Sequence, residues 1–206
     1  LGYPKGRLMP TTTSPLPVAA GQIVSTPGDI AGNLAQVADL SRQAARAGAR
    51  LILFGEGALT GYLLTPEMLA LALTKDGPAA QKLLGLARKH GIVIVAGTLE
   101  RAGKRLHMSA FVAYPDGRLL VQRKHRLTPT ELGAGLTPGP EKRMVFSVDG
   151  VKCAICICAD SGIENLYNKL ADQGVQLSLH PTAGGGGRKF MKHAADLDDP
   201  RRLKSY

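Results

Sequence analysis

Three cysteines, Cys153, Cys156 and Cys158, lie within six residues of one another and are the side chains best suited to nucleophilic chemistry. Their odd number and close spacing do not suit a disulfide framework, and neighbours on one strand cannot surround a zinc ion, so reduced thiols are expected. Residues 151–158 have the pattern of a strand, in which alternation places Cys156 and Cys158 on one face and Cys153 on the other. Buried cysteines are most often inert apolar side chains, and this is the alternative for Cys153 and Cys156.

Cys158 differs from the other two cysteines because a polar turn, 159–162, follows it and leads into a predicted helix. Free N–H groups at a helix N-terminus favour negative charge, so this position is expected to lower the pKa of the thiol. Ligand sites of open α/β sheets also collect at the carboxyl ends of strands. The sequence therefore makes Cys158 a candidate nucleophile.

A nucleophilic cysteine needs a base, and two charged residues at other strand ends are candidate partners. Glu56 follows the apolar strand 51–54, where burial raises the pKa of a carboxyl group toward the range of a general base. Lys124 ends the predicted strand 118–124, and its ammonium is suited to stabilising an oxyanion. Each also has an ordinary structural explanation, as a capping carboxylate and a solvated lysine. None of the five histidines is singled out by its position.

The elements that must position these residues alternate between strand and helix in the first half of the chain and include hairpins in the second half. This combination requires a mixed sheet or two stacked sheets, so the fold class is α/β, in a single domain over residues 1–206. A flexible loop is expected at Gly184–Gly187. The predicted elements are strand 18–24, helix 29–48, strand 51–54, a helix starting at Pro66, helix 76–91, strand 92–98, hairpin 106–124, hairpin 144–158, helix 163–173 and strand 175–179.

The composition is that of a globular, water-soluble protein, since 44% of the residues are hydrophobic and 20% are charged. The longest apolar runs fall far short of the roughly 20 residues that a membrane span needs, and no continuous apolar segment marks a signal peptide. Together with reduced cysteines, these features predict a cytoplasmic protein. The net charge is +10, but the basic residues are scattered and only 4% of residues are aromatic, so no nucleic-acid or membrane partner is expected.

Three segments carry the candidate residues in a characteristic order: 51–62 with Glu56, 123–127 with Lys124 and then Glu131 and Pro138-Gly139, and 154–160 with Cys158. Together they resemble the motifs of the nitrilase superfamily of carbon–nitrogen hydrolases, and the resemblance covers about residues 17–183. It implies an αββα sandwich with mixed sheets and with helices on the outer faces. It also implies that copies of the chain associate into a homodimer or a larger homo-oligomer.

The same resemblance implies roles for five residues. Glu56 would be the general base, Lys124 the cation that stabilises the oxyanion, and Cys158 the nucleophile. Glu131 would orient the substrate and the lysine, and the backbone N–H of Ala159 would contribute to the oxyanion hole. This chemistry requires no metal ion and no organic cofactor.

The Cys-Ala-Asp sequence at 158–160 is more similar to the amidase and carbamoylase branches of the superfamily than to the nitrilases. The expected reaction is hydrolysis of a small linear amide through a cysteine thioester, with release of ammonia or an amine. A nitrile or N-carbamoyl substrate, and a non-catalytic scaffold of the same fold, are the alternatives. Gly55 stands where the family usually has proline. The family normally continues after strand 175–179 with a helix and further strands, so the C-terminal part of the fold is expected to be missing.

Overall fold

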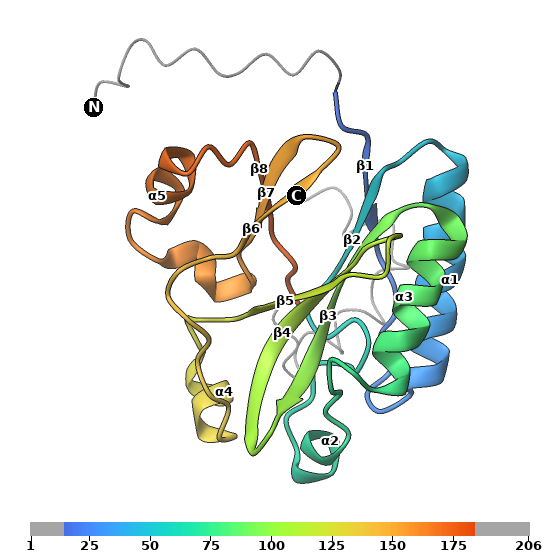
Figure 1. Cartoon of the computed structure of the whole chain (residues 1–206). Coiled ribbons are helices and arrows are strands. Elements are labelled where there is room, and N and C mark those ends of the chain that lie inside the picture. The colour runs from blue at the N-terminus through green and yellow to red at the C-terminus, as the bar shows by residue number, and fades with distance from the viewer. Residues whose placement is uncertain (1–14, 184–206) are drawn as a thin grey trace, which may run out of the picture.

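A computed structural model of the chain describes residues 15–183 (Figure 1). The predicted loop at Gly184–Gly187 and the basic tail after it lie outside the described residues. Within the described part, no helix combines the length and the apolar character needed to cross a membrane. Strands and helices alternate in the first half and hairpins follow, as the sequence predicts.

The larger of two sheets is mixed, as expected. Its strands, in spatial order, are β1 (Val18–Gly21), β2 (Leu51–Phe54), β3 (Val93–Ala102), β4 (Arg105–Ala113) and β5 (Leu119–Arg123). β1, β2 and β3 are parallel, whereas β4 is antiparallel to both β3 and β5. β5 therefore runs in the same direction as β2, and the carboxyl ends of these two strands lie at the same edge of the sheet.

Two long helices, α1 (Ile30–Arg46) and α3 (Pro78–His90), cover one face of this sheet (Figure 1). An apolar cluster fills the space between the helices and the strands, and it includes Val37 from α1, Leu83 from α3 and Phe111 from β4. All three of these side chains are fully buried. Burial of this apolar surface is the main stabilising contribution of the helical layer.

The ends of the helices follow signals that are local in the sequence. The carboxylate of Asp29 accepts a hydrogen bond from a first-turn N–H of α1 and caps that helix, as predicted. Gly91 ends α3 in the left-handed conformation, with φ of 64°. Two short helices, α2 (Pro66–Ala70) and α4 (Pro129–Gly133), each begin with proline at the first position.

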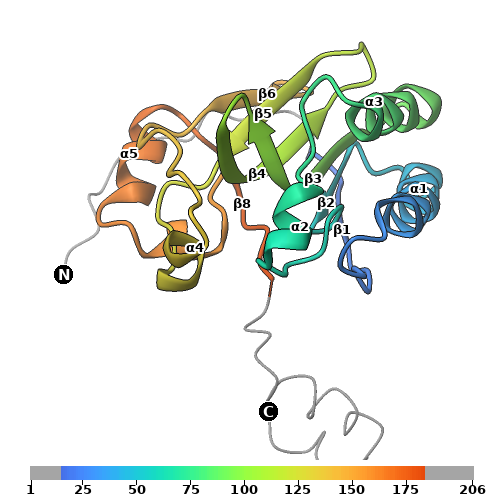
Figure 2. The same cartoon turned by 90° about the horizontal axis from the view of Figure 1, so that it is seen from below.

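The smaller sheet consists of β6 (Val145–Val148), β7 (Val151–Ile155) and β8 (Leu177–Leu179) in that order, and it is also mixed. Helix α5 (Leu166–Asp172) packs on its outer face. A second apolar cluster, which includes Met108 of the larger sheet and residues of β6 and β7, fills the space between the two sheets. Figure 2 shows α5 on one side of the sheets and the pair α1 and α3 on the other.

The strand predicted at 151–158 ends earlier, at Ile155, and this changes the position of Cys158. Cys158 begins a 3-10 turn (Cys158–Gly162) with φ of 45°, in the left-handed region that residues other than glycine seldom adopt. Cys156 belongs to the apolar cluster beneath α5, whereas Cys158 contacts the cluster between the sheets. The prediction that Cys156 and Cys158 share a face is wrong, because the left-handed turn breaks the alternation of the strand.

Replacing Phe111 by alanine is expected to lower the free energy of unfolding by about 3–5 kcal/mol, because the buried ring leaves a cavity between the helices and the sheet. Urea titration followed by circular dichroism measures the change. Val24→Ala is the control, since Val24 is 81% exposed and its truncation should cost less than about 0.5 kcal/mol. A loss below about 1 kcal/mol for Phe111→Ala would contradict the described packing.

Candidate active site

The structure brings the predicted site residues together, although they are far apart in the sequence. Glu56 follows β2, Lys124 follows β5 and Cys158 follows β7, so each stands just beyond the carboxyl end of a strand. The first two strands belong to the larger sheet and the third to the smaller sheet. The site therefore lies where the ends of two stacked sheets meet, and its geometry depends on how the sheets pack.

The ammonium group of Lys124 lies between two carboxylates. Its Nζ is 2.8 Å from Oε1 of Glu56 and 2.8 Å from Oε1 of Glu131, and the three side chains are at most 1% exposed. Burying a charge costs on the order of several kcal/mol unless it is well paired, and here every charge has a partner. Burial disfavours the ammonium form, but the two carboxylates outweigh this effect and raise the pKa of Lys124 above its ordinary value. Lys124 is therefore a permanent cation at neutral pH.

Glu131 is held in place by the helix start that carries it. At the N-terminus of α4, its Oε2 accepts a hydrogen bond from the Thr128 N–H at 2.7 Å, and its own N–H donates to the Thr128 hydroxyl. Its Oε1 accepts from Lys124 and, at 3.0 Å, from the hydroxyl of Tyr62. Both carboxylate oxygens are thus engaged. Tyr62 is not among the residues predicted from the sequence, although it closes the Leu-Thr-Gly-Tyr run that follows Glu56.

Glu56 contacts Lys124 through Oε1, and its Oε2 accepts a hydrogen bond from the backbone N–H of Ala183 at 3.1 Å. This contact requires the chain after β8 to approach the turn after β2 closely: a Cβ on Gly55 would lie 3.0 Å from the carbonyl oxygen of Thr182. Glycine at position 55 avoids this tight contact. Burial raises the pKa of the Glu56 carboxyl group, and Lys124 opposes this rise without cancelling it. A raised pKa suits a general base that works near neutral pH.

The thiol of Cys158 is partly buried, and it lies close enough to Glu56 and Lys124 for both charges to act on its pKa. Burial raises its pKa and the Glu56 carboxylate raises it further, while Lys124 and the backbone N–H of Ala159 act in the opposite direction. The net effect is a pKa above the ordinary value. The prediction that this position lowers the pKa of the thiol is wrong, because burial and the Glu56 carboxylate outweigh the N–H of Ala159 in the 3-10 turn. The resting thiol is therefore protonated at neutral pH and must give its proton to a base before it reacts.

Hydrogen bonds on both sides of Cys158 maintain its left-handed backbone. Its N–H donates to the carbonyl oxygen of Pro181 at 3.0 Å, and the hydroxyl of Ser161 donates to its carbonyl oxygen at 2.9 Å. Such a conformation costs on the order of 1–3 kcal/mol and persists only where the surroundings enforce it. The turn directs the sulfur toward the space between the sheets, and the Ala159 N–H lies close enough to the sulfur to affect its pKa.

The other two thiols are buried in the core, and the two histidines near the site form hydrogen bonds to neighbouring groups. Cys153 is fully buried, and burial raises its pKa to about 11. Nδ1 of His125 lies 2.8 Å from the carbonyl oxygen of Gly139, and Nε2 of His180 lies 3.0 Å from the hydroxyl of Ser178.

Among residues 15–183, no group of three or more His, Cys, Asp or Glu side chains is arranged to hold a metal ion.

The sequence comparisons find relatives among carbon–nitrogen hydrolases and nitrilases. The family model for carbon–nitrogen hydrolases matches residues 17–195. A hydrolase from the pqqF 5' region of Pseudomonas protegens is 31% identical over 81% of this chain and 59% of its own length. An aliphatic nitrilase of Rhodococcus rhodochrous is 33% identical over 58% of this chain and 36% of its own length. The chain thus spans less than two thirds of the length of either relative.

A solved structure gives the same result at the level of the fold. A serine variant of the Nesterenkonia AN1 amidase, from the nitrilase superfamily, matches with a TM-score of 0.73 at 26% identity, covering 84% of this chain and 68% of that chain. In a form of that amidase with glutamine in place of a glutamate, acrylamide has added to the active-site cysteine. A form with alanine in place of the cysteine is in complex with butyramide.

Replacing Glu56 by glutamine is expected to separate the reactivity of the thiol from turnover. Removing the neighbouring negative charge lowers the pKa of Cys158, so its alkylation by iodoacetamide should have a lower pH midpoint than in the unmodified protein. The role expected for Glu56 as general base predicts that hydrolysis nevertheless falls at least about 100-fold.

Peptide mass spectrometry after timed labelling measures this midpoint. Cys153 and Cys156 serve as internal controls in the same molecule, because both are fully buried and should label far more slowly. An unchanged or higher midpoint in Glu56→Gln would show that the carboxylate does not act on the thiol.

Proposed function

Because the chain belongs to the carbon–nitrogen hydrolase family of the nitrilase superfamily, we propose that it hydrolyses the carbon–nitrogen bond of a small linear amide through a cysteine thioester. The observation that carries this proposal is the buried Lys124, paired at 2.8 Å with both Glu56 and Glu131 and lying beside the Cys158 thiol. A base of raised pKa, a fixed cation and a thiol are the groups that acyl transfer through cysteine requires.

The acylation step begins with transfer of the thiol proton from Cys158 to Glu56. The sulfur then forms a bond to the carbonyl carbon of the amide, and the electron pair of the C=O double bond moves onto oxygen. The ammonium of Lys124 and the N–H of Ala159 stabilise this oxyanion. When the tetrahedral intermediate collapses, the carbon–nitrogen bond breaks and the proton held by Glu56 goes to the leaving nitrogen, which departs as ammonia or an amine.

Deacylation uses the same groups in the same order. Glu56, again ionised, takes a proton from a water molecule as its oxygen attacks the thioester carbon, and Lys124 again faces the oxyanion. The carbon–sulfur bond then breaks, and the proton on Glu56 returns to the sulfur of Cys158. The products are a carboxylic acid and the free thiol, so no metal ion or organic cofactor is needed for the balance.

A scaffold without catalytic activity is the rival from another class, and the charges in the site argue against it. Replacing a buried ion pair by apolar side chains of similar size is often neutral or stabilising, so a fold does not need such a pair for stability. Here three buried charges converge beside a thiol on a strained turn. Perturbed pKa values and backbone strain in one place are typical of functional sites.

Amides are favoured over nitriles as the substrate class for two reasons. The solved relative is an amidase, and forms of it are in complex with acrylamide or butyramide. In this chain, Ala159 and Asp160 follow Cys158, as the resemblance to the amidase branch requires. The similarity to an aliphatic nitrilase makes nitriles the second candidate class, with N-carbamoyl compounds as the third.

We further propose that the described layers belong to one αββα sandwich domain of a cytoplasmic protein. The apolar cluster between the two sheets supports a single domain, because it draws its side chains from both sheets. The resemblance to the superfamily supports association of copies into a homodimer or a larger homo-oligomer, which sedimentation velocity would measure.

The purified protein is expected to release ammonia from at least one small amide among acetamide, propionamide, butyramide and acrylamide, because the site holds a nucleophile, a base and an oxyanion cation. Cys158→Ala, which removes only the sulfur, should show the uncatalysed background. Butyronitrile and N-carbamoylglycine in the same assay test the alternative substrates. If none of these compounds gives cysteine-dependent release, the proposed activity is wrong.

Replacing Lys124 by alanine is expected to lower kcat at least about 100-fold, since an oxyanion donor is typically worth about 3 kcal/mol. Lys104→Ala is the matched control, because Lys104 is an exposed lysine in the turn between β3 and β4. Circular dichroism verifies that both variants are folded. Full activity of Lys124→Ala on every accepted substrate would eliminate the assigned role.

A further inference from the structure

Asp160 is a buried carboxylate close to the site that takes no part in the proposed proton transfers. It lies two residues after Cys158, is 0% exposed, and accepts two hydrogen bonds on each oxygen. A buried carboxylate persists only when such partners satisfy it, and each of these bonds is directional. The four groups that donate to Asp160 are therefore held in fixed positions relative to one another.

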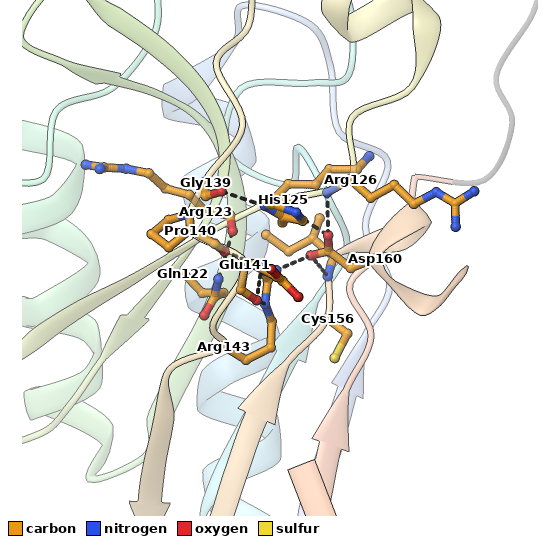
Figure 3. Close-up of polar contacts among 12 residues, drawn as sticks. Gln122, Arg123, His125, Arg126, Gly139, Pro140, Glu141, Arg143, Cys156 and Asp160 are labelled. Carbon is orange, nitrogen blue, oxygen red and sulfur yellow. Dashed lines mark hydrogen bonds and ion pairs between the residues drawn. The ribbon is translucent and has the colours of Figure 1, made fainter. Parts of the chain in front are cut away.

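One oxygen of Asp160 reaches the turn that carries Lys124. Oδ1 accepts hydrogen bonds from the backbone N–H groups of His125, at 3.0 Å, and Arg126, at 2.8 Å. These residues follow Lys124 directly, just past the end of β5 in the larger sheet. Figure 3 shows the Asp160 side chain directed at this turn. The carboxylate therefore holds the backbone next to Lys124 from the opposite sheet.

The other oxygen of Asp160 holds the turn that carries Cys158. Oδ2 accepts a hydrogen bond from the N–H of Ile157 at 3.0 Å and forms an ion pair at 2.8 Å with Arg143, whose side chain is 1% exposed. The remaining nitrogens of Arg143 donate to the backbone carbonyl oxygens of Pro140 and Glu141 (Figure 3). Arg143 is thus the countercharge of Asp160 and is itself fixed.

Resting on the proposed function, we infer that Asp160 is a positioning residue that joins the Lys124 turn to the Cys158 turn and so sets the distance between the ammonium and the nucleophilic sulfur. The apolar cluster between the sheets fixes no orientation, and the hydrogen bonds that Tyr114 and Gln122 form with Ser147 and Met144 do not involve the Lys124 or Cys158 turns. The bonds of Asp160 act within one residue of both Lys124 and Cys158. They supply the directional restraint that the apolar contacts lack.

This inference has an electrostatic consequence with a definite sign. Lys124 lowers the pKa of both Glu56 and Cys158, against the effect of burial. If the Lys124 turn loosens, this opposing effect weakens and both pKa values rise. The midpoint of Cys158 alkylation and the acid limb of kcat/KM should then move to higher pH. Simple loss of folded protein lowers activity by the same factor at every pH and leaves both midpoints in place.

Asp160→Asn in the otherwise unchanged chain tests the inference, because in either orientation the amide places N–H donors against two of the four donors that Asp160 binds. The pH midpoint of Cys158 labelling by iodoacetamide should rise. With butyramide as substrate, kcat should fall about 100-fold, as expected for a misplacement of about 1 Å, while KM stays within about threefold. Arg143→Lys, which keeps the charge but loses the planar contacts, should change the same quantities in the same direction by less.

Asp149→Asn is the matched control. Asp149 lies in the turn between β6 and β7, at the end of the smaller sheet opposite Cys158, and its carboxylate pairs at 2.6 Å with the exposed Arg50. Asparagine tolerates the positive φ of this position. This variant should leave both midpoints unchanged. If the Cys158 labelling midpoint and the acid limb of kcat/KM do not shift in Asp160→Asn, the inference is overturned. It is also overturned if both Asp160→Asn and Arg143→Lys fail to fold, because the Asp160–Arg143 pair would then serve folding alone. If the unmodified protein hydrolyses no butyramide, the proposed substrate is at fault, whereas the labelling midpoint still decides the role of Asp160.

Discussion

An ammonium ion buried between two carboxylates is the interaction on which the rest of this site depends. Burying Lys124, Glu56 or Glu131 alone would cost a large desolvation free energy. Together, each charged group has a partner of opposite sign at 2.8 Å. Because both carboxylates share one nitrogen, loss of Lys124 would leave two carboxylates without a countercharge in the interior. The interaction also connects the end of β2, the end of β5 and the start of α4, so the electrostatics of the site and its architecture cannot be separated.

The charges in the site act on one another in a way that suits a cysteine hydrolase. Burial raises the pKa of Glu56, and burial together with Glu56 raises the pKa of Cys158. The resting thiol is therefore neutral and has an acceptor for its proton beside it. Lys124 stays charged, so a positive charge is already in place for the oxyanion of the proposed reaction. Such preorganisation requires no rearrangement during the reaction.

Where the ends of the two sheets meet, the turns that follow the strands must adopt irregular conformations to direct their side chains into the site. Cys158 adopts a left-handed backbone that redirects its sulfur from the outer face of the smaller sheet to the space between the sheets. Asp160 then connects this turn to the residues after Lys124. Glycine at position 55 avoids a tight contact with the carbonyl oxygen of Thr182 where the chain around Ala183 reaches Glu56. In each case a local irregularity serves a contact between distant parts of the chain.

The sequence by itself was sufficient for most of the elements, but not for α4 or the 3-10 turn, and for the identity of the charged residues at the site. Asp29, Gly91 and the turn after β4 are local signals, and the spacing of Glu56, Lys124 and Cys158 relative to strand ends can be found without coordinates. Only the tertiary structure decided the conformation of Cys158, because strand alternation assumes an extended chain. It also decided two contacts between distant positions: Tyr62 with Glu131, 69 positions apart, and Ala183 with Glu56, 127 positions apart. A local sequence pattern does not show which distant hydroxyl or backbone group will pack against a buried carboxylate.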